Sequence, residues 1–169
     1  MIRALAEAAN RGLDVRVMLE PHPFGGGSAP SKTLDTLAAA GVKAQFTNPS
    51  FSLTHAKGMI IDGTSAYIMT SNFSRSALGG SSGSSGYRNR EYGIIDTTQQ
   101  DVLATEAIFV ADWNRSTVQF NDPNLVVSPI NSRNDFTTLI NSARSTLLIE
   151  AEEVNYPWLK PEACKSLID

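Results

Sequence analysis

The chain has 169 residues and a formal net charge of −3 at pH 7, so the chain as a whole gives no basis for a general electrostatic attraction to nucleic acid or anionic lipid, and a local basic site is left open. With 41% hydrophobic and 18% charged residues, it is expected to be globular and to bury a core. Cys164 is the only cysteine, so an intrachain disulfide and a thiolate metal cluster are excluded. No segment approaches the ~20 apolar residues that span a bilayer, so we expect a soluble protein without a transmembrane segment.

The N-terminal part of the chain predicts helices that alternate with strands. Apolar residues recur at helical spacing in two segments and alternate in two others. Each helical segment stops at a glycine, Gly12 or Gly41, and Ser31 is placed to cap the second one. The elements expected here are a helix at 2–9, a strand at 13–19, a helix at 31–41 and a strand at 42–46.

A β-hairpin is expected in the middle of the chain. Two short apolar runs, 57–61 and 66–70, flank the turn-rich segment 62–65, as is typical of a hairpin. A strand at 91–96 and a helix should follow, and Phe109 and Trp113 of that helix are expected in the core. Strands interleaved with helices favour an α/β fold.

The rest of the chain predicts a linker and a second unit. Residues 1–115 are expected to form the first unit, and the proline-rich and asparagine-rich segment 116–133 a linker. The segment 134–169 should open a second repeat, with a helix at 136–143 and a strand at 146–149. Alternatively, it should complete the sheet of its own chain, as in a permuted unit, or that of a neighbouring chain by swapping. We therefore expect a fragment or a processed chain.

One constellation of residues points to chemistry. Thr54-His55-Ala56-Lys57-Gly58-Met59-Ile60-Ile61-Asp62 is followed by Thr70-Ser71-Asn72, and this pattern resembles the HKD motif of the phospholipase D superfamily. Asn89-Arg90-Glu91 resembles the Asn-x-Glu that opens the family's next strand. The flanking segments resemble bacterial phospholipase D-like and cardiolipin synthase-like proteins. Met69 and Thr70 depart from the family pattern, which has Gly and Ser there.

The spacing of His55 and Lys57 is chemically sensible. On a strand, residues two apart project from the same face, so both side chains can meet one phosphate. A neutral imidazole can attack phosphorus, while an ammonium and an amide N–H donate to the non-bridging oxygens as charge builds up. This chemistry requires no metal and no cofactor.

The resemblance implies a two-step phosphodiesterase reaction with named roles. His55 would form a phosphohistidine, and a second histidine from another HKD unit would protonate the leaving group and later activate water or an alcohol. Lys57, Asn72 and Thr70 would bind phosphate oxygens. Glu91 would hold the nucleophilic imidazole in the right tautomer.

Three further residues are candidates of lower rank. Asp62 and Asn89 are expected to support the motif structurally and to take no part in the reaction. His22 lies between two prolines and is a candidate for the entrance of the substrate site. The alternative for His22 is an ordinary loop residue, because no metal-binding partner accompanies it at a usual spacing.

The resemblance also implies the fold and the partners. We expect an α-β-α layered sandwich with a mixed central sheet, and a homodimer in which two His55 side chains face each other. The expected substrate is a phospholipid or a small phosphodiester in preference to nucleic acid, acted on by a hydrolase or a phosphatidyltransferase. The alternatives are a nuclease of the same superfamily and an inactive fragment that serves in assembly. A bacterial origin is expected, with a cytoplasmic and a membrane-peripheral location both left open.

Overall fold

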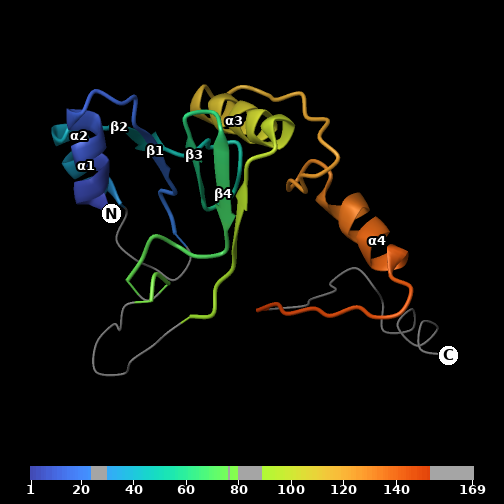
Figure 1. The fold of residues 1–169 in the computed structure, drawn as a ribbon. Coiled ribbons are helices and arrows are strands. Elements are labelled where there is room, and N and C mark those ends of the chain that lie inside the picture. The colour runs from blue at the N-terminus through green and yellow to red at the C-terminus, as the bar shows by residue number, and fades with distance from the viewer. Residues whose placement is uncertain (24–29, 76, 80–88, 153–169) are drawn as a thin grey trace. The chain divides into compact units, whose positions relative to one another are not determined.

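The computed structural model describes residues 1–23, 30–75, 77–79 and 89–152, so Cys164 lies outside the described residues. The chain divides into two compact units, Met1–Leu125 and Val126–Asp169. Figure 1 shows the helices and strands in chain order. No helix in this part of the chain has the length and apolar character needed to cross a lipid bilayer.

The first unit begins with two helices and a parallel pair of strands. Its elements are α1 (Ile2–Asn10), β1 (Arg16–Leu19), α2 (Ser31–Ala39) and β2 (Lys43–Phe46), and β1 pairs with β2 from Arg16 opposite Lys43 to Leu19 opposite Phe46. Gly12 and Gly41 follow the helices with φ of 90° and 79°, a backbone conformation that costs glycine little. Both predicted helix stops are therefore confirmed.

The expected cap of α2 is wrong by one residue. The N-cap is Pro30, no side chain caps the helix, and Ser31 is already helical. Proline fixes φ close to the helical value and so begins the helix without a side-chain hydrogen bond.

The same unit continues with an antiparallel sheet and a long helix. Strands β3 (Gly58–Ile61), β4 (Ser65–Met69) and β5 (Gly93–Asp96) pair in that order, and α3 (Gln99–Trp113) packs against β3 and β4. Asp62 and Gly63 have φ of 53° and 61° and form the hairpin turn. The expected hairpin, third strand and helix are all present.

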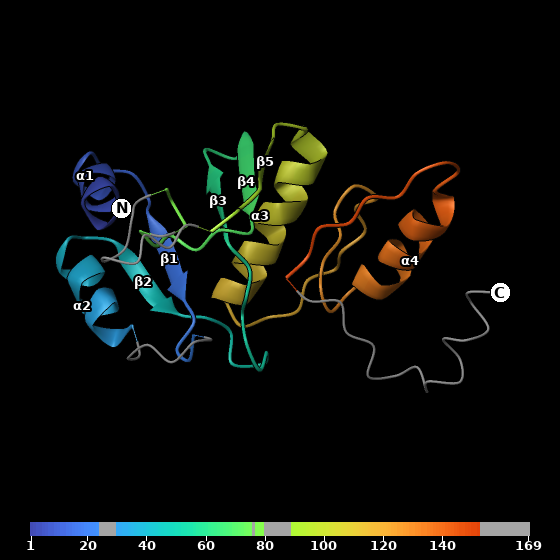
Figure 2. The ribbon, with the colours of Figure 1, turned by 90° about the horizontal axis from the view of Figure 1, so that it is seen from below.

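The strands of the first unit form two sheets. β1 and β2 are parallel while β3, β4 and β5 are antiparallel, and no ladder joins the two sets within the described ranges. The expected mixture of strand directions is present, but not as one continuous ladder. In Figure 2, α1 and α2 lie on one side of the strands and α3 on the other, which gives the α/β unit its α-β-α layers.

Side chains connect β1 and β2 to the end of α3. The amide of Gln45 donates to the carbonyl of Trp113 at 2.8 Å. The guanidinium of Arg16 lies 5.8 Å from the centroid of the Trp113 ring, close enough for a cation–π contact. Phe109 stacks on Trp113 with a centroid distance of 6.0 Å, and both rings are half-buried.

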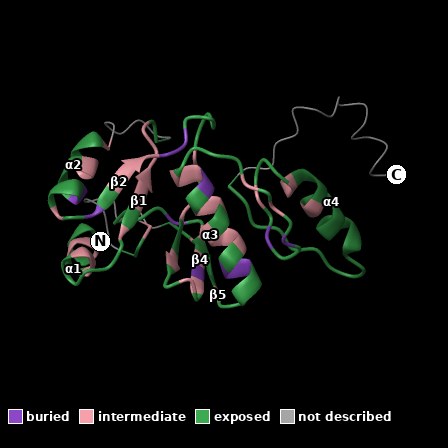
Figure 3. Ribbon diagram, turned by 90° about the horizontal axis from the view of Figure 1, so that it is seen from above, coloured by how far each residue is buried: buried purple, intermediate pink, exposed green. Residues whose placement is uncertain are grey.

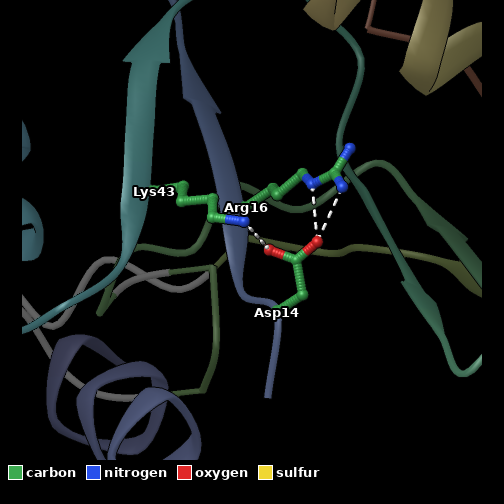
Figure 4. A network of polar contacts seen from close by, with 3 residues as sticks. All are labelled: Asp14, Arg16 and Lys43. Carbon is green, nitrogen blue, oxygen red and sulfur yellow. Dashed lines mark hydrogen bonds and ion pairs between the residues drawn. The ribbon is translucent and has the colours of Figure 1, made fainter. Parts of the chain in front are cut away.

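An ion cluster joins the two parallel strands at their first residues. Arg16 and Lys43 are register partners, and both contact the carboxylate of Asp14, at 2.6 Å and 2.7 Å. Figure 4 shows Asp14 between the two cations. The hydrogen bonds from Arg16 and Lys43 lower the pKa of Asp14 to about 2, so its negative charge offsets the repulsion of the paired cations.

The core of the first unit is small (Figure 3). Its side chains come from α2, β4 and α3 and from the segments beside them. The buried apolar residues are Leu37, Val42, Ala66, Val102, Ala111 and Leu125.

The second unit contains one helix, α4 (Ser132–Ser142), in its described part. The expected helix is confirmed, but the strand expected at 146–149 is absent from the described residues. A strand requires a partner for its backbone groups, and no described segment pairs with this one. Leu148 is 88% exposed, which agrees with a segment that no second layer covers.

Candidate active site

His55 and Lys57 lie on the segment that enters β3. We expected them on a strand, but β3 begins at Gly58. The amide of Met69 donates to the carbonyl of Lys57 at 3.1 Å, which extends the pairing of β3 and β4 by one step. Lys57 is therefore held by the hairpin, whereas His55 lies just outside it.

The side chains of His55 and Lys57 contact each other, although His55 lies outside the strand on which both were expected. The Lys57 Nζ atom lies 2.9 Å from Nε2 and 3.1 Å from Nδ1 of the His55 ring. An ammonium group only donates hydrogen bonds, so the ring nitrogen that accepts must carry a lone pair, as in neutral imidazole. The His55 side chain is exposed, so a substrate can reach the ring.

Glu91 forms a second polar group with Thr70 and Asn89. Its Oε2 atom accepts a hydrogen bond from the Thr70 hydroxyl at 2.6 Å, and its Oε1 atom accepts one from the Asn89 amide at 3.1 Å. The Thr70 and Asn89 bonds lower the pKa of Glu91 against the effect of desolvation, and the charge of Lys57 lowers it further. Glu91 is therefore an ionised carboxylate that interacts electrostatically with the Lys57 ammonium.

The contacts of Glu91 differ from those that the resemblance implies. Within the described ranges, neither oxygen of Glu91 has a hydrogen bond to His55; both accept from Thr70 and Asn89. Thr70 is itself fixed, because its amide donates to the Tyr92 carbonyl and its hydroxyl accepts from the Tyr92 amide, both at 2.9 Å. Thr70 thus connects the end of β4 to the carboxylate.

Three other candidates do not join these groups. Asn72 is exposed just beyond β4, and in the described structure it has no hydrogen bond to His55 or Lys57. Asp62 lies in the hairpin turn, at the end of β3 away from Lys57. His22 is exposed, and its amide donates to Glu20 Oε1 at 3.0 Å.

Met69, which stands where the family has glycine, is accommodated opposite a glycine. It pairs with Gly93 on β5, and a Cβ built on Gly93 would lie 3.4 Å from the Met69 Cβ. A Cβ at that distance would be in ordinary van der Waals contact, so Met69 fits beside this position without a clash. A groove of about 320 Å³ runs beside this pair and is lined by Glu91, Tyr92 and the ends of β4 and β5.

Sequence reasoning missed Glu20. Its carboxylate accepts a hydrogen bond from the amide of Thr54 at 2.8 Å, directly before His55. The available signal was its position after β1, because the carboxyl ends of parallel strands commonly carry functional groups. Nothing in the HKD-like pattern pointed to a residue so far away in the sequence.

In the described segments, no three His, Cys, Asp or Glu side chains are arranged to hold a metal ion. The group in contact with His55 is the Lys57 ammonium, a cation suited to binding an anion beside a nucleophile.

Comparison with known proteins gives the family and the fold. Residues 1–113 match the family model described as "Cardiolipin synthase, PLD-like domain". The chain is similar to the solved structure of Nuc, a phospholipase D family member from Salmonella typhimurium, with a TM-score of 0.54 and 19% identity over 71% of this chain and 73% of that one. No curated protein matches the chain in sequence.

Two further solved structures are similar. Polyphosphate kinase from Porphyromonas gingivalis has a TM-score of 0.55 and 17% identity, over 83% of this chain but 23% of that one. NucT from Helicobacter pylori has a TM-score of 0.49 and 14% identity, over 67% of this chain and 70% of that one. At such identities, the likenesses to Nuc and to the kinase concern the fold alone.

Proposed function

Because the chain belongs to the cardiolipin synthase, PLD-like domain family of the phospholipase D superfamily, we propose that it is a metal-independent phosphodiesterase that works through a phosphohistidine. The observation that carries this proposal is the contact of the Lys57 ammonium with the His55 ring at 2.9 Å and 3.1 Å. From this position, the Lys57 ammonium can reach an oxygen of a phosphate bound beside the His55 ring with only a small movement.

The reaction follows from these groups in two steps. A ring nitrogen of His55 attacks phosphorus, the nitrogen–phosphorus bond forms, and the bond from phosphorus to the leaving oxygen breaks. A second histidine donates a proton to that oxygen. The same histidine then takes a proton from water, whose oxygen attacks phosphorus and releases His55. Lys57 stabilises the charge on the non-bridging oxygens in both steps.

Thr70 and Glu91 support Lys57 in this scheme. The Thr70 hydroxyl donates its hydrogen bond to Glu91. We therefore propose that its first role is to hold the carboxylate and that donation to phosphate is its second role. An ionised Glu91 near Lys57 adds a negative charge that favours the ammonium in its place. Asn72 is proposed as a phosphate donor, since its exposed amide is available to a ligand.

The second histidine is proposed to come from another copy of the chain. The HKD-like pattern occurs once in the sequence, and the only other histidine, His22, lies in a different loop. A two-fold dimer whose axis passes beside His55 would bring two His55 rings to one phosphate, because such an axis places the same residue on both sides. The substrate proposed is a phospholipid or a small phosphodiester, given the net charge of −3.

Hydrolysis of bis(p-nitrophenyl) phosphate in EDTA tests the activity. We expect turnover by the wild-type chain, none by His55→Ala, and a loss of about 10²–10³-fold in kcat for Lys57→Ala. Lys32→Ala, which removes an exposed lysine of α2, is the matched control and should keep wild-type activity. A folded wild-type dimer without turnover would favour the inactive assembly protein, and selective cleavage of DNA over phospholipid vesicles would favour the nuclease.

Mixed dimers test the shared site. Equal amounts of wild-type and His55→Ala chains, allowed to exchange subunits, should retain about a quarter of the wild-type activity if each site needs two His55 residues, and about half if each chain acts alone.

A further inference from the structure

Glu20 connects three segments that meet at the ends of β1 and β2. The residue follows β1 directly. Its Oε2 atom accepts hydrogen bonds from the Thr54 amide at 2.8 Å and from the Thr47 hydroxyl at 3.2 Å, and its Oε1 atom accepts one from the His22 amide at 3.0 Å. Both carboxylate oxygens are therefore occupied by donors from separate parts of the chain.

The bond to Thr54 matters because the surrounding segment has little else to hold it. Among the described residues, the Thr54 amide is the only main-chain group between residues 52 and 56 that has a hydrogen bond. On the other side of His55, the Lys57 carbonyl accepts from the Met69 amide at 3.1 Å. The main chain is thus fixed on both sides of His55, by Glu20 before it and by the hairpin after it.

The hydrogen bonds that the Glu20 carboxylate accepts are strong. Desolvation would raise the pKa of Glu20, but the hydrogen bonds from the Thr54 and His22 amides and the Thr47 hydroxyl outweigh it, so the pKa lies below its ordinary value. The group is an ionised carboxylate, and hydrogen bonds from amides to carboxylates are shorter and stronger than neutral ones. Thr47 is itself fixed, because it is buried and its amide donates to the Leu19 carbonyl at 3.0 Å.

We propose that Glu20 is a positioning residue that fixes the main chain before His55 and so holds the imidazole against Lys57. This inference rests on the proposed function, in which His55 is the nucleophile. Glu20 touches neither the ring nor the phosphate and acts through Thr54. Small displacements of a nucleophile slow its attack far more than they weaken binding of the substrate.

Kinetics with bis(p-nitrophenyl) phosphate provide the first part of the test. Glu20→Ala removes the acceptor and should lower kcat by about tenfold or more with KM within a factor of two. Glu20→Gln can turn its one oxygen toward Thr54 and Thr47, so it should recover most of the lost kcat. Glu7→Gln, a change of the same kind on the exposed face of α1, should leave both constants unchanged.

Exchange of the Thr54 amide hydrogen, followed by NMR on the full chain, provides the second part and needs no turnover. The Thr54 amide should exchange slowly in the wild-type chain and in Thr47→Val, which removes the other donor to the same oxygen, and at least tenfold faster in Glu20→Ala. If Glu20→Ala does not fold, Glu20→Asp, which is one methylene shorter, replaces it with the same expected results.

The outcomes separate this inference from the proposed function. The positioning role would be overturned if Glu20→Ala had the same kcat as the wild type. It would also be overturned if the Thr54 amide exchanged equally fast in the wild type and in Glu20→Ala. A wild-type chain without turnover would overturn the proposed function, while the exchange rates would still show whether Glu20 holds Thr54.

Discussion

Gly58 approaches Tyr67 so closely that a Cβ atom on Gly58 would lie 2.7 Å from the Tyr67 carbonyl oxygen. Gly58 is the first residue of β3 and follows Lys57 directly. The approach therefore concerns the placement of the lysine as well as the packing of the hairpin.

Gly58→Ala is expected to destabilise the protein and to displace Lys57. The clash is with backbone, which moves less easily than a side chain, so the free energy of unfolding should fall by about 1–3 kcal/mol. Urea unfolding measures this loss. Gly93→Ala is the matched control, because its Cβ would lie 3.4 Å from the nearest atom; an equal loss in both variants would contradict the steric explanation.

Thr70→Val is expected to raise the pKa of Glu91 toward its ordinary value. The variant removes the hydrogen bond from the Thr70 hydroxyl, which is the largest cause of the lowered pKa. NMR titration of the Glu91 carboxyl carbon checks the shift. Thr70→Ser keeps a hydroxyl and should keep the low pKa, so a raised value in both variants would assign the effect to something other than the hydrogen bond.

Asp14→Asn should make stability depend less on pH in strong acid. The pKa of Asp14 is lowered from 3.8 to about 2 by Arg16 and Lys43, so the carboxylate stabilises the folded state above pH 3.8, and this contribution is lost as the pH falls through about 2. The difference in unfolding free energy between wild type and variant should be constant near neutrality and vanish at low pH. Because the cluster is exposed, the difference should also shrink in 1 M salt.

Asp101 should affect the pH dependence of stability in the opposite direction to Asp14, and Asp101→Asn should remove that effect. Asn124 lowers the pKa of Asp101 by hydrogen bonding, but burial and the charges of Asp122 and Asp96 outweigh it and raise the pKa above 3.8. A raised pKa contributes stability that is complete below pH 3.8 and is lost as the pH rises through the folded-state pKa. Urea unfolding from pH 3.5 to 7 should show this loss in the wild type and not in the variant.

The helices and hairpin could be predicted because their signals are local. The periodicity of apolar residues indicated α3, Gly12 and Gly41 marked helix ends, and the turn at Asp62 and Gly63 followed from residue types that accept positive φ. The segment 146–149 shows the limit, since alternation describes a strand's faces but supplies no partner for its backbone.

The candidate site divides in the same way. The spacing predicted that His55 and Lys57 could reach one phosphate, whereas their direct contact is seen only in the structure. The joining of Thr70 to Glu91 depends on the pairing of β4 with β5. Glu20 could not be found from spacing, because its bond to Thr54 spans 34 residues. Such a contact exists only once the two sheets have taken their places.

The register of the hairpin also limits where the chain can tolerate insertions and deletions. Gly58 pairs with Ile68 and Ile61 with Ser65, so the ladder sets how far along the chain Thr70 follows Lys57. One residue added to either strand would turn the side chains beyond it to the opposite face of the sheet. An added residue in the turn at 62–64 would instead leave the ladder in register and disturb the contact of the turn with α3, where the Gly63 carbonyl accepts a hydrogen bond from the Gln99 side chain at 3.2 Å.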